Sequence, residues 1–225
     1  MRNAVVVGDY IVTIDNSGCI GEKPLDAVQT TNEITAYFTA RTAIVEQWCA
    51  GARPVQLLLA NFTGDAAWDG YVRGITKVFA EIGEVLPPLT GSTESNFESA
   101  QSAVALTMIG ERFFTPTKEA CRYFVIGKPL VGKQVLENPQ HVANLGELYA
   151  LLKEQVIQAV WPTGSKGIGA EITRFLGAHY TCDVDLQHTA GPTTAVLVAV
   201  KDSHVAKLRG IITAPITEIG EKPKQ

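Results

Sequence analysis

The chain has 225 residues, of which 46% are hydrophobic and 8% aromatic, and 19 Lys and Arg against 23 Asp and Glu leave a net charge of −4 at pH 7. This composition excludes an intrinsically disordered chain, because disorder requires fewer apolar residues and a larger charge imbalance. The absence of a basic block argues against a nucleic-acid partner, and no apolar run reaches the roughly 20 residues of a membrane span. We therefore expect a cytoplasmic protein with neither a nucleic-acid nor a membrane partner.

The first half of the chain predicts alternating strands and helices. Residues 10–15 resemble a strand that ends at an acidic residue, a turn follows at 16–21, and a short strand is expected at 26–30. Thr30-Thr-Asn-Glu33 matches a capping box and opens an amphipathic helix that Gly51 ends. Residues 55–62 are almost wholly apolar and predict a strand buried on both faces. A second helix is expected over residues 65–82.

A loop over residues 86–96, with two prolines and Gly91, leads to a strand at 101–110. The stretch 113–120, rich in Thr and Pro, is the expected boundary between domains at 1–112 and 121–225. Beyond it the pattern predicts the following elements and ends: a strand at 121–126, a helix at 144–159, a loop at 161–169, a helix at 170–177, a strand at 193–200, a helix at 203–210, a strand at 211–219 and a frayed tail at 221–225.

Three predicted strand ends carry polar loops with a carboxylate, at Asp15, Asp65 and Glu94. Ligands gather where strand ends meet loops, and Mg²⁺ prefers a few carboxylates together with phosphate oxygens and water. The three side chains are therefore candidate metal ligands. The alternative is structural, with Asp15 and Asp65 as turn or cap residues and Glu94 in solvent.

The loop Gly164-Ser-Lys-Gly-Ile-Gly169 opens a predicted helix, so its backbone N–H groups and Lys166 are candidates for holding a phosphate. It is not a Walker A sequence. Gly127-Lys-Pro-Leu-Val-Gly-Lys133 is more similar to a Walker A sequence, but Gln134 stands where that motif has the Ser or Thr whose hydroxyl binds Mg²⁺. We therefore expect this segment to be a strand followed by a proline turn.

The cysteines predict reduced thiols, because four widely separated residues without a C-x-x-C pair indicate neither a disulfide framework nor a zinc ribbon. The segment from His179 to His188 collects His, Cys and Asp, but on a strand His179 and Cys182 would point to opposite faces. Cys19 is the one thiol with a candidate chemical role, and a small buried residue is the alternative.

Several of these loops occur in an order that resembles the PurM-like ATP-binding superfamily. Asp15-Asn-Ser-Gly-Cys-Ile-Gly21 is followed by Ala50-Gly-Ala-Arg-Pro54 and then by Thr90-Gly-Ser-Thr-Glu94. Within the superfamily, the longer string Thr90-Gly-Ser-Thr-Glu-Ser-Asn-Phe97, together with Asn61-Phe-Thr-Gly-Asp-Ala-Ala-Trp68, resembles the alpha-ribazole kinases of cobamide salvage. The resemblance extends over most of the chain.

The resemblance implies an α+β fold of the PurM type. Its N-terminal αβ subdomain would contribute a mixed sheet to a dimeric barrel, and a smaller αβ subdomain would follow. The strands at 26–30 and 55–62 would lie in that barrel, and the chain would form a homodimer.

The resemblance also implies a kinase that transfers the γ-phosphoryl group of ATP to the 5′-hydroxyl of alpha-ribazole. The reaction needs mainly positioning and charge neutralisation, with ATP and Mg²⁺ as cofactors. Asp15, Asp65 and Glu94 would hold the metal, Asp15 or Asp65 would accept the hydroxyl proton, and Lys166 would take the transferred charge. The nucleotide-binding residues would be Asn16, Ser17, Gly91, Ser92, Thr93, Asn96, Gly164, Ser165 and Gly167.

Two departures from the superfamily leave the number of metal ions and the identity of the base open. Relatives usually have an Asp-rich string where this chain has Gly164-Ser-Lys-Gly167, and many have Asn or Asp in place of Glu46. Two further hypotheses therefore stand beside the alpha-ribazole kinase. One keeps the fold and ATP but changes the acceptor to thiamin monophosphate, an amide oxygen or selenide held through Cys19. The other is a nucleotide-binding protein without turnover.

Overall fold

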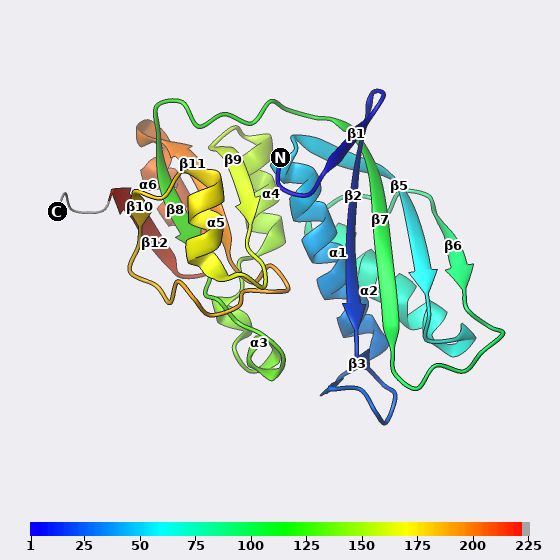
Figure 1. Cartoon of the computed structure of the whole chain (residues 1–225). Coiled ribbons are helices and arrows are strands. Elements are labelled where there is room, and N and C mark those ends of the chain that lie inside the picture. Colours follow the sequence, from blue (N-terminus) through cyan, green and yellow to red (C-terminus); the bar gives the residue numbers. More distant parts are fainter. Residues whose placement is uncertain (222–225) are drawn as a thin grey trace. The chain divides into compact units, whose positions relative to one another are not determined.

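The computed structural model describes residues 1–221, which fold into two compact units that divide between Phe114 and Thr115. The first unit has a five-stranded mixed sheet in the order β1-β2-β7-β5-β6 (Figure 1). Its elements in chain order are β1 (Val5–Val7), β2 (Tyr10–Gly18), β3 (Ile20–Gly21), β4 (Val28–Gln29), α1 (Asn32–Cys49), β5 (Ala52–Asn61), a 3-10 turn (Asp65–Ala67), α2 (Trp68–Glu81), β6 (Leu89–Thr93) and β7 (Ala103–Arg112).

The predicted first helix is confirmed as α1, with its cap one residue later than expected. The side chain of Thr31 accepts a hydrogen bond from the backbone N–H of Ile34, which satisfies one of the free donors at the helix start. Glu33 does not close a capping box. Its carboxylate instead pairs with Arg73, at 3.0 Å, and with Lys77, both of which lie on α2.

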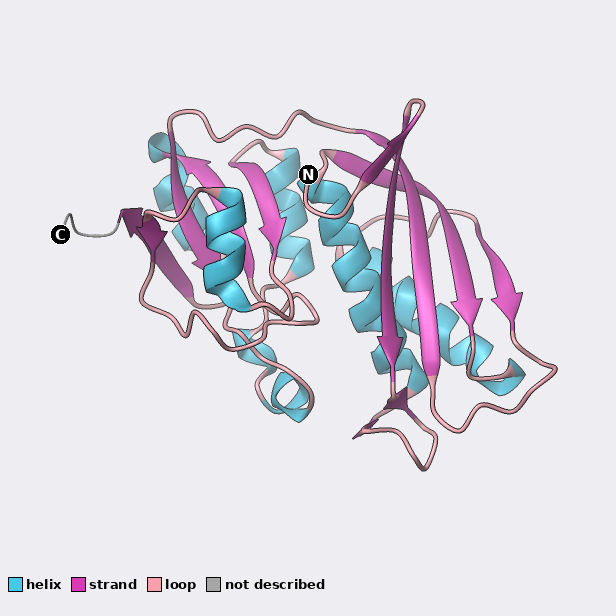
Figure 2. Ribbon diagram, viewed as in Figure 1, coloured by secondary structure: helices cyan, strands magenta, loops and turns pink. Residues whose placement is uncertain are grey.

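Helix α1 lies against one face of the sheet, and α2 packs beside it on the same face (Figure 2). The buried Gln47 amide donates to the backbone oxygens of Ile11 and Met108, at 3.0 and 2.9 Å, which anchors α1 to β2 and β7. The prediction that residues 55–62 are buried on both faces is wrong. Leu57 and Leu59 face the helices and are buried, whereas Leu58 points to the other face and is 40% exposed.

Three further expectations change because strands extend or shrink once they pair. Strand β2 continues to Gly18, so Asp15 lies inside a strand and not at a loop mouth. Residues 89–93 form strand β6 and not a loop, and a side chain at Gly91 would place its β-carbon 1.9 Å from the Leu59 carbonyl oxygen. The strand expected at 26–30 reduces to β4, which pairs with β3 outside the main sheet.

We expect Gly74→Ala to destabilise the first unit by about 1–3 kcal/mol, because it overpacks the contact between α1 and α2. A β-carbon at Gly74 would lie 2.1 Å from the backbone oxygen of Glu33 and 2.8 Å from the backbone nitrogen of Tyr37. The control is Gly210→Ala, also in a helix, where a β-carbon meets nothing within 4 Å. Urea unfolding followed by circular dichroism measures both, and equal midpoints would contradict the prediction.

The second unit has a five-stranded sheet in the order β10-β12-β8-β11-β9, with α5 on one face and α4 and α6 on the other (Figure 1). Its elements are β8 (Cys121–Ile126), α3 (Lys133–Glu137), a 3-10 turn (Pro139–His141), α4 (Leu145–Lys153), β9 (Ile157–Pro162), α5 (Gly167–Phe175), β10 (Tyr180–Thr181), β11 (Val196–Lys201), a 3-10 turn (Asp202–His204), α6 (Val205–Ile211) and β12 (Ile216–Glu221).

The helix predicted at 144–159 is wrong over its last six residues. Helix α4 ends at Lys153, and Gln155 takes a φ of 54°, which a helix does not allow. The apolar residues from Ile157 onward belong to strand β9. Of the predicted tail at 221–225, Glu221 belongs to β12, and residues 222–225 lie outside the described part of the chain. Among residues 1–221, no helix is both long and apolar enough to cross a membrane.

Candidate functional site

Three motifs that are distant in sequence meet at one end of the first unit's sheet. Strands β2 and β5 both pair antiparallel with β7, and β6 pairs parallel with β5. The register therefore aligns Ser17, Val104, Asn61 and Thr93 in one row across four strands. The carboxyl ends of β2, β5 and β6 share this edge, which is where ligands gather in sheet proteins.

The alternation of side chains divides the predicted nucleotide-binding residues between the two faces of the sheet. Ser17 and Thr93 face the helices, where the Ser17 hydroxyl lies 2.8 Å from that of Thr39 and Thr93 accepts from the Asn61 amide at 3.2 Å. Asn16 and Ser92 occupy the next row, point to the opposite face and are exposed. A single ligand on one face of the sheet would therefore contact only part of the predicted set.

Asp15 lies on the helix face of β2, half-buried, two residues before Ser17. Burial raises the pKa of its carboxyl group to about 7, and the nearby charge of Glu46 acts in the same direction. A backbone hydrogen bond from Asn16, the Arg2 charge and the Thr42 hydroxyl oppose this effect only in part. A carboxylate with this pKa can accept a proton near neutral pH, which suits a general base.

Glu46 is the residue beside Asp15 that the motif analysis did not assign to the site. It lies on α1, is 1% exposed, and pairs with the Arg2 guanidinium. The available signal was a lone acidic residue in the otherwise uncharged run from Thr42 to Cys49, because a charge inside a buried helix usually has a specific partner. No local motif links Glu46 to Arg2, because the two residues are 44 positions apart in the sequence.

Asp65 and Glu94 lie near the same edge of the sheet but in different environments. Asp65 is exposed and begins the 3-10 turn before α2. The Glu94 backbone N–H donates to the backbone oxygen of Asn61 at 2.8 Å. The Glu94 carboxylate accepts from the backbone N–H groups of Asn96, at 2.7 Å, and Phe97, at 3.3 Å. Glu94 therefore closes its own turn, while Asn96 is exposed.

The candidate metal ligands do not form a preassembled cluster. Within residues 1–221, no three His, Cys, Asp or Glu side chains are grouped so that they could hold a metal ion. Asp15, Asp65 and Glu94 thus do not converge as a set of three. Mg²⁺ commonly takes one or two carboxylates together with phosphate oxygens and water, so the half-buried Asp15 fits a metal that arrives with a nucleotide, and the assignment of these ligands remains a prediction.

A buried carboxylate, Asp26, holds the loop between β2 and α1 against the start of β7. Its oxygens accept from the Ser102 backbone N–H at 2.7 Å, the Ser102 hydroxyl at 2.6 Å and the Lys23 backbone N–H at 2.9 Å. Burial alone would raise the Asp26 pKa, but the hydrogen bonds from Ser102 and Lys23 outweigh burial and lower it. The same loop carries Cys19, whose thiol donates to the Gln101 side chain at 3.3 Å.

We expect Asp26→Asn to cost about 1–3 kcal/mol of stability at pH 7, because buried donors lose a charged acceptor. Since the folded pKa is lowered, the contribution of Asp26 is present above the unfolded pKa near 4 and is lost as the pH falls through the folded value. The difference between the proteins in melting temperature should therefore shrink toward pH 3. The control is Asp185→Asn, which removes an exposed acceptor of two backbone N–H groups. A difference in melting temperature between wild type and Asp26→Asn that stays constant with pH would contradict the prediction.

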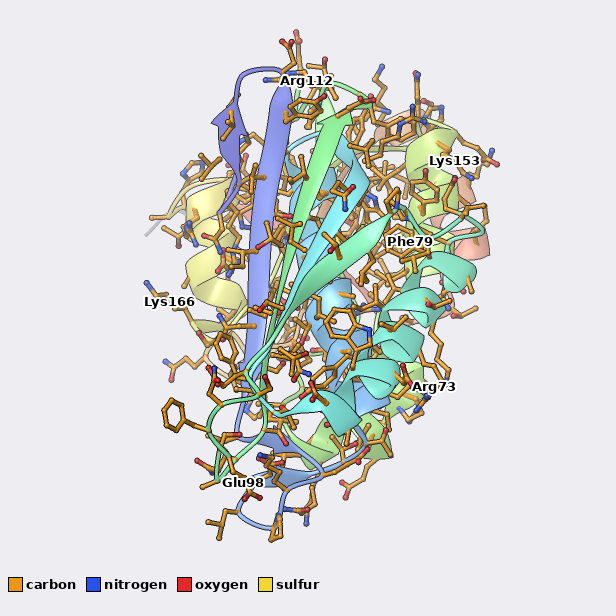
Figure 3. All side chains as sticks on the ribbon, turned by 90° about the vertical axis from the view of Figure 1, so that its right-hand side faces the viewer. Arg73, Phe79, Glu98, Arg112, Lys153 and Lys166 are labelled. Carbon is orange, nitrogen blue, oxygen red and sulfur yellow. The ribbon has the colours of Figure 1, made fainter. Side chains whose placement is uncertain are left out.

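The glycine-rich loop belongs to the second unit, where it joins β9 to α5. Two of its predicted phosphate-binding amides already have partners: the Gly167 N–H donates to Gly164 O at 3.1 Å, and the Gly169 N–H donates to Leu186 O at 2.8 Å. Gly167 has a φ of +78°, and a β-carbon there would lie 2.7 Å from Leu186 O. In this conformation the Gly167 amide is not available to a phosphate. Ser165 and Lys166 are exposed, and the Lys166 side chain extends away from α5 (Figure 3).

Comparison with solved structures shows the fold. Thiamine monophosphate kinase from Aquifex aeolicus superposes with a TM-score of 0.64 at 10% identity, over 97% of this chain and 87% of that one. The hydrogenase maturation protein HypE in complex with ATP gives a TM-score of 0.60 at 10% identity, over 96% and 78%. PurL from T. maritima, complexed with AMPPCP, gives 0.56 at 13% identity, over 98% of this chain and 42% of that one.

The expected α+β architecture with a mixed sheet is thus confirmed as the fold that this chain shares with HypE and thiamine monophosphate kinase. No protein-family model matches the chain, and no curated protein is significantly similar to it in sequence.

Proposed function

We propose that this protein is an ATP-dependent kinase that phosphorylates the 5′-hydroxyl of alpha-ribazole. The observation that carries the proposal is the half-buried Asp15 carboxyl group, with a pKa of about 7, at the sheet edge where the β2, β5 and β6 motifs meet. The fold supports the use of ATP, because solved proteins of this fold were crystallised with ATP or AMPPCP. The strings at 61–68 and 90–97 support the choice of acceptor.

In this proposal Asp15 would hold Mg²⁺ together with phosphate oxygens and water, and Asp65 or Glu94 at the same edge would be a second ligand. The ion would neutralise phosphate charge. Asp15 or Asp65 accepts the proton of the attacking hydroxyl, and the acceptor is the one of the two that does not bind the metal. Asn96 is the proposed phosphate-orienting residue because it is exposed near this edge, whereas Asn16 points to the sheet face opposite Asp15. Lys166, on the second unit, is a proposed phosphate ligand because its ammonium is exposed.

The test incubates the purified protein with ATP, Mg²⁺ and alpha-ribazole and follows ADP and the nucleoside by chromatography. The expected result is one ADP for each alpha-ribazole 5′-phosphate, with thiamin monophosphate giving a much lower rate. The partnered amides of Gly167 and Gly169 favour a second candidate, a nucleotide-binding protein without turnover. Calorimetric binding of ATP without any product would reject the kinase and support that second candidate.

We also propose a homodimer formed through the face of the first unit's sheet that α1 and α2 leave uncovered. Figure 3 looks onto this sheet with α1 behind it. Its strands place apolar side chains on that face, each 40–59% exposed: Val5, Val7, Tyr10, Ile14 and Leu58. A row of exposed apolar residues of this kind usually marks an interface, and a second copy of the sheet would cover it.

If this face is the interface, Ile14→Glu should convert the dimer to a monomer at micromolar concentration. Ile14 is 57% exposed, so the substitution places a charge in the interface while the fold of one chain is kept. Light scattering coupled to gel filtration measures the mass. Thr76→Glu, on the exposed side of α2, is the matched control and should leave the mass unchanged. A dimeric Ile14→Glu protein would contradict this choice of face.

A further inference from the structure

The N-terminal residues Arg2 and Asn3 bind the buried carboxylate of Glu46. The Arg2 guanidinium pairs with Oε1 of Glu46, and the side chains of Arg2 and Glu46 are 11% and 1% exposed. Asn3 adds two donors, its side-chain amide to Oε1 at 3.2 Å and its backbone N–H to Oε2 at 3.4 Å. Both carboxylate oxygens of Glu46 therefore accept hydrogen bonds from residues 2 and 3.

This ion pair lies beside Asp15, whose charge is repelled by Glu46 and attracted by Arg2. Two adjacent carboxylates on β2 and α1 would attract a divalent cation, because cation affinity rises with the number of charged ligands. Arg2 supplies the neutralising charge from the chain itself. Removing one partner of a buried ion pair leaves the other uncompensated, so a cation that used Glu46 would first have to displace the Arg2 guanidinium.

We propose that Arg2 is a positioning residue that keeps Glu46 out of cation binding and leaves Asp15 as the member of this carboxylate pair that is open to a divalent ion. The inference rests on the proposed function, in which Asp15 holds the Mg²⁺ that accompanies ATP. It explains how a buried acidic residue can lie next to the site without adding a further metal ligand.

The test measures Mn²⁺ binding without nucleotide, by thermal shift and by electron paramagnetic resonance of the free ion. Three proteins are compared: wild type, Arg2→Gln, and the double variant Arg2→Gln with Glu46→Gln. Arg2→Gln releases Glu46 and should bind Mn²⁺ at least about tenfold more tightly, because a second carboxylate becomes available. The double variant lacks the charges of both Arg2 and Glu46. Its Mn²⁺ affinity should lie within about threefold of the wild-type value, because both proteins keep Asp15.

Two results would overturn the inference. One is an Arg2→Gln protein that folds normally and binds Mn²⁺ no more tightly than wild type. The other is a double variant whose affinity falls about tenfold, because that loss would make Glu46 a ligand in the wild type. The second comparison needs only wild type and the charge-balanced double variant, so it decides the question even where Arg2→Gln does not fold. The matched control is Arg73→Gln, which breaks the ion pair between Arg73 of α2 and Glu33, a residue of the helix that carries Glu46. It should leave Mn²⁺ binding unchanged.

These readouts are separate from the kinase assay. The expected Mn²⁺ pattern without phosphorylation of alpha-ribazole would support the role of Arg2 and reject the proposed acceptor. Phosphorylation with unchanged Mn²⁺ binding in Arg2→Gln would keep the kinase and reject the role of Arg2.

Discussion

Asp15→Asn should lower the rate of alpha-ribazole phosphorylation by about 10²–10³-fold, because it removes the negative charge through which Asp15 would hold Mg²⁺ or accept the hydroxyl proton. The substitution preserves the size and shape of the side chain, so β2 keeps its pairing with β7 from Tyr10 to Gly18. The measurement is the initial rate of ADP formation at saturating ATP and Mg²⁺. Most of the loss should appear in kcat, since proton transfer and charge neutralisation act in the transition state.

The matched control is Asp9→Asn, which changes an exposed carboxylate in the turn just before β2. It should retain the wild-type rate. An Asp15→Asn protein with the wild-type rate would show that the metal and base assignments are wrong, even if the protein phosphorylates alpha-ribazole.

Asp15→Asn should also stabilise the protein in the absence of metal at pH 8, by on the order of 2–4 kcal/mol. Burial raises the folded pKa of Asp15 to about 7 from an ordinary value of 3.8. Between these two pH values the unfolded chain loses the proton while the folded protein keeps it, so the wild type loses stability as the pH rises. The loss is complete above about pH 7, and Asn does not titrate.

Melting temperatures in a metal chelator between pH 3 and pH 8 test this expectation. The two proteins should melt together near pH 3, and the variant should melt higher as the pH rises through the window from about 4 to 7. Asp9→Asn again serves as the control and should follow the wild type across the series. A variant less stable than wild type at pH 8 would mean that the charged form of Asp15 is stabilised in the folded protein. A stability gain together with lost activity would mark Asp15 as a residue kept for function.

Local patterns in the sequence were sufficient where the local preference agrees with the pairing that the fold imposes. The helical spacing and the Thr-rich start predicted α1, and the strands expected at 101–110 and 193–200 correspond to β7 and β11. The errors occurred where long-range pairing overrides local propensity. Residues 89–93 contain Gly91 and follow two prolines, yet pairing with β5 makes them a strand. The apolar residues from Ile157 onward fit a helix until their pairing with β11 is known.

For the candidate site, the sequence by itself determined the chemical groups: the carboxylates Asp15, Asp65 and Glu94 and the amide and hydroxyl groups near the same strand ends. Only the tertiary structure decided which of them share a face. Because side chains alternate along a strand, register places Ser17 and Thr93 toward the helices and Asn16 and Ser92 away from them.

The charge beside Asp15 likewise depends on tertiary structure. Arg2 and Glu46 are separated by 44 residues, and their ion pair forms only when α1 packs under β2. Burial of these groups between sheet and helix raises the pKa of Asp15, and no local pattern encodes burial that a distant segment supplies. The sequence determined which acids and bases the chain has, and packing raised the pKa of one of them, Asp15, to about 7.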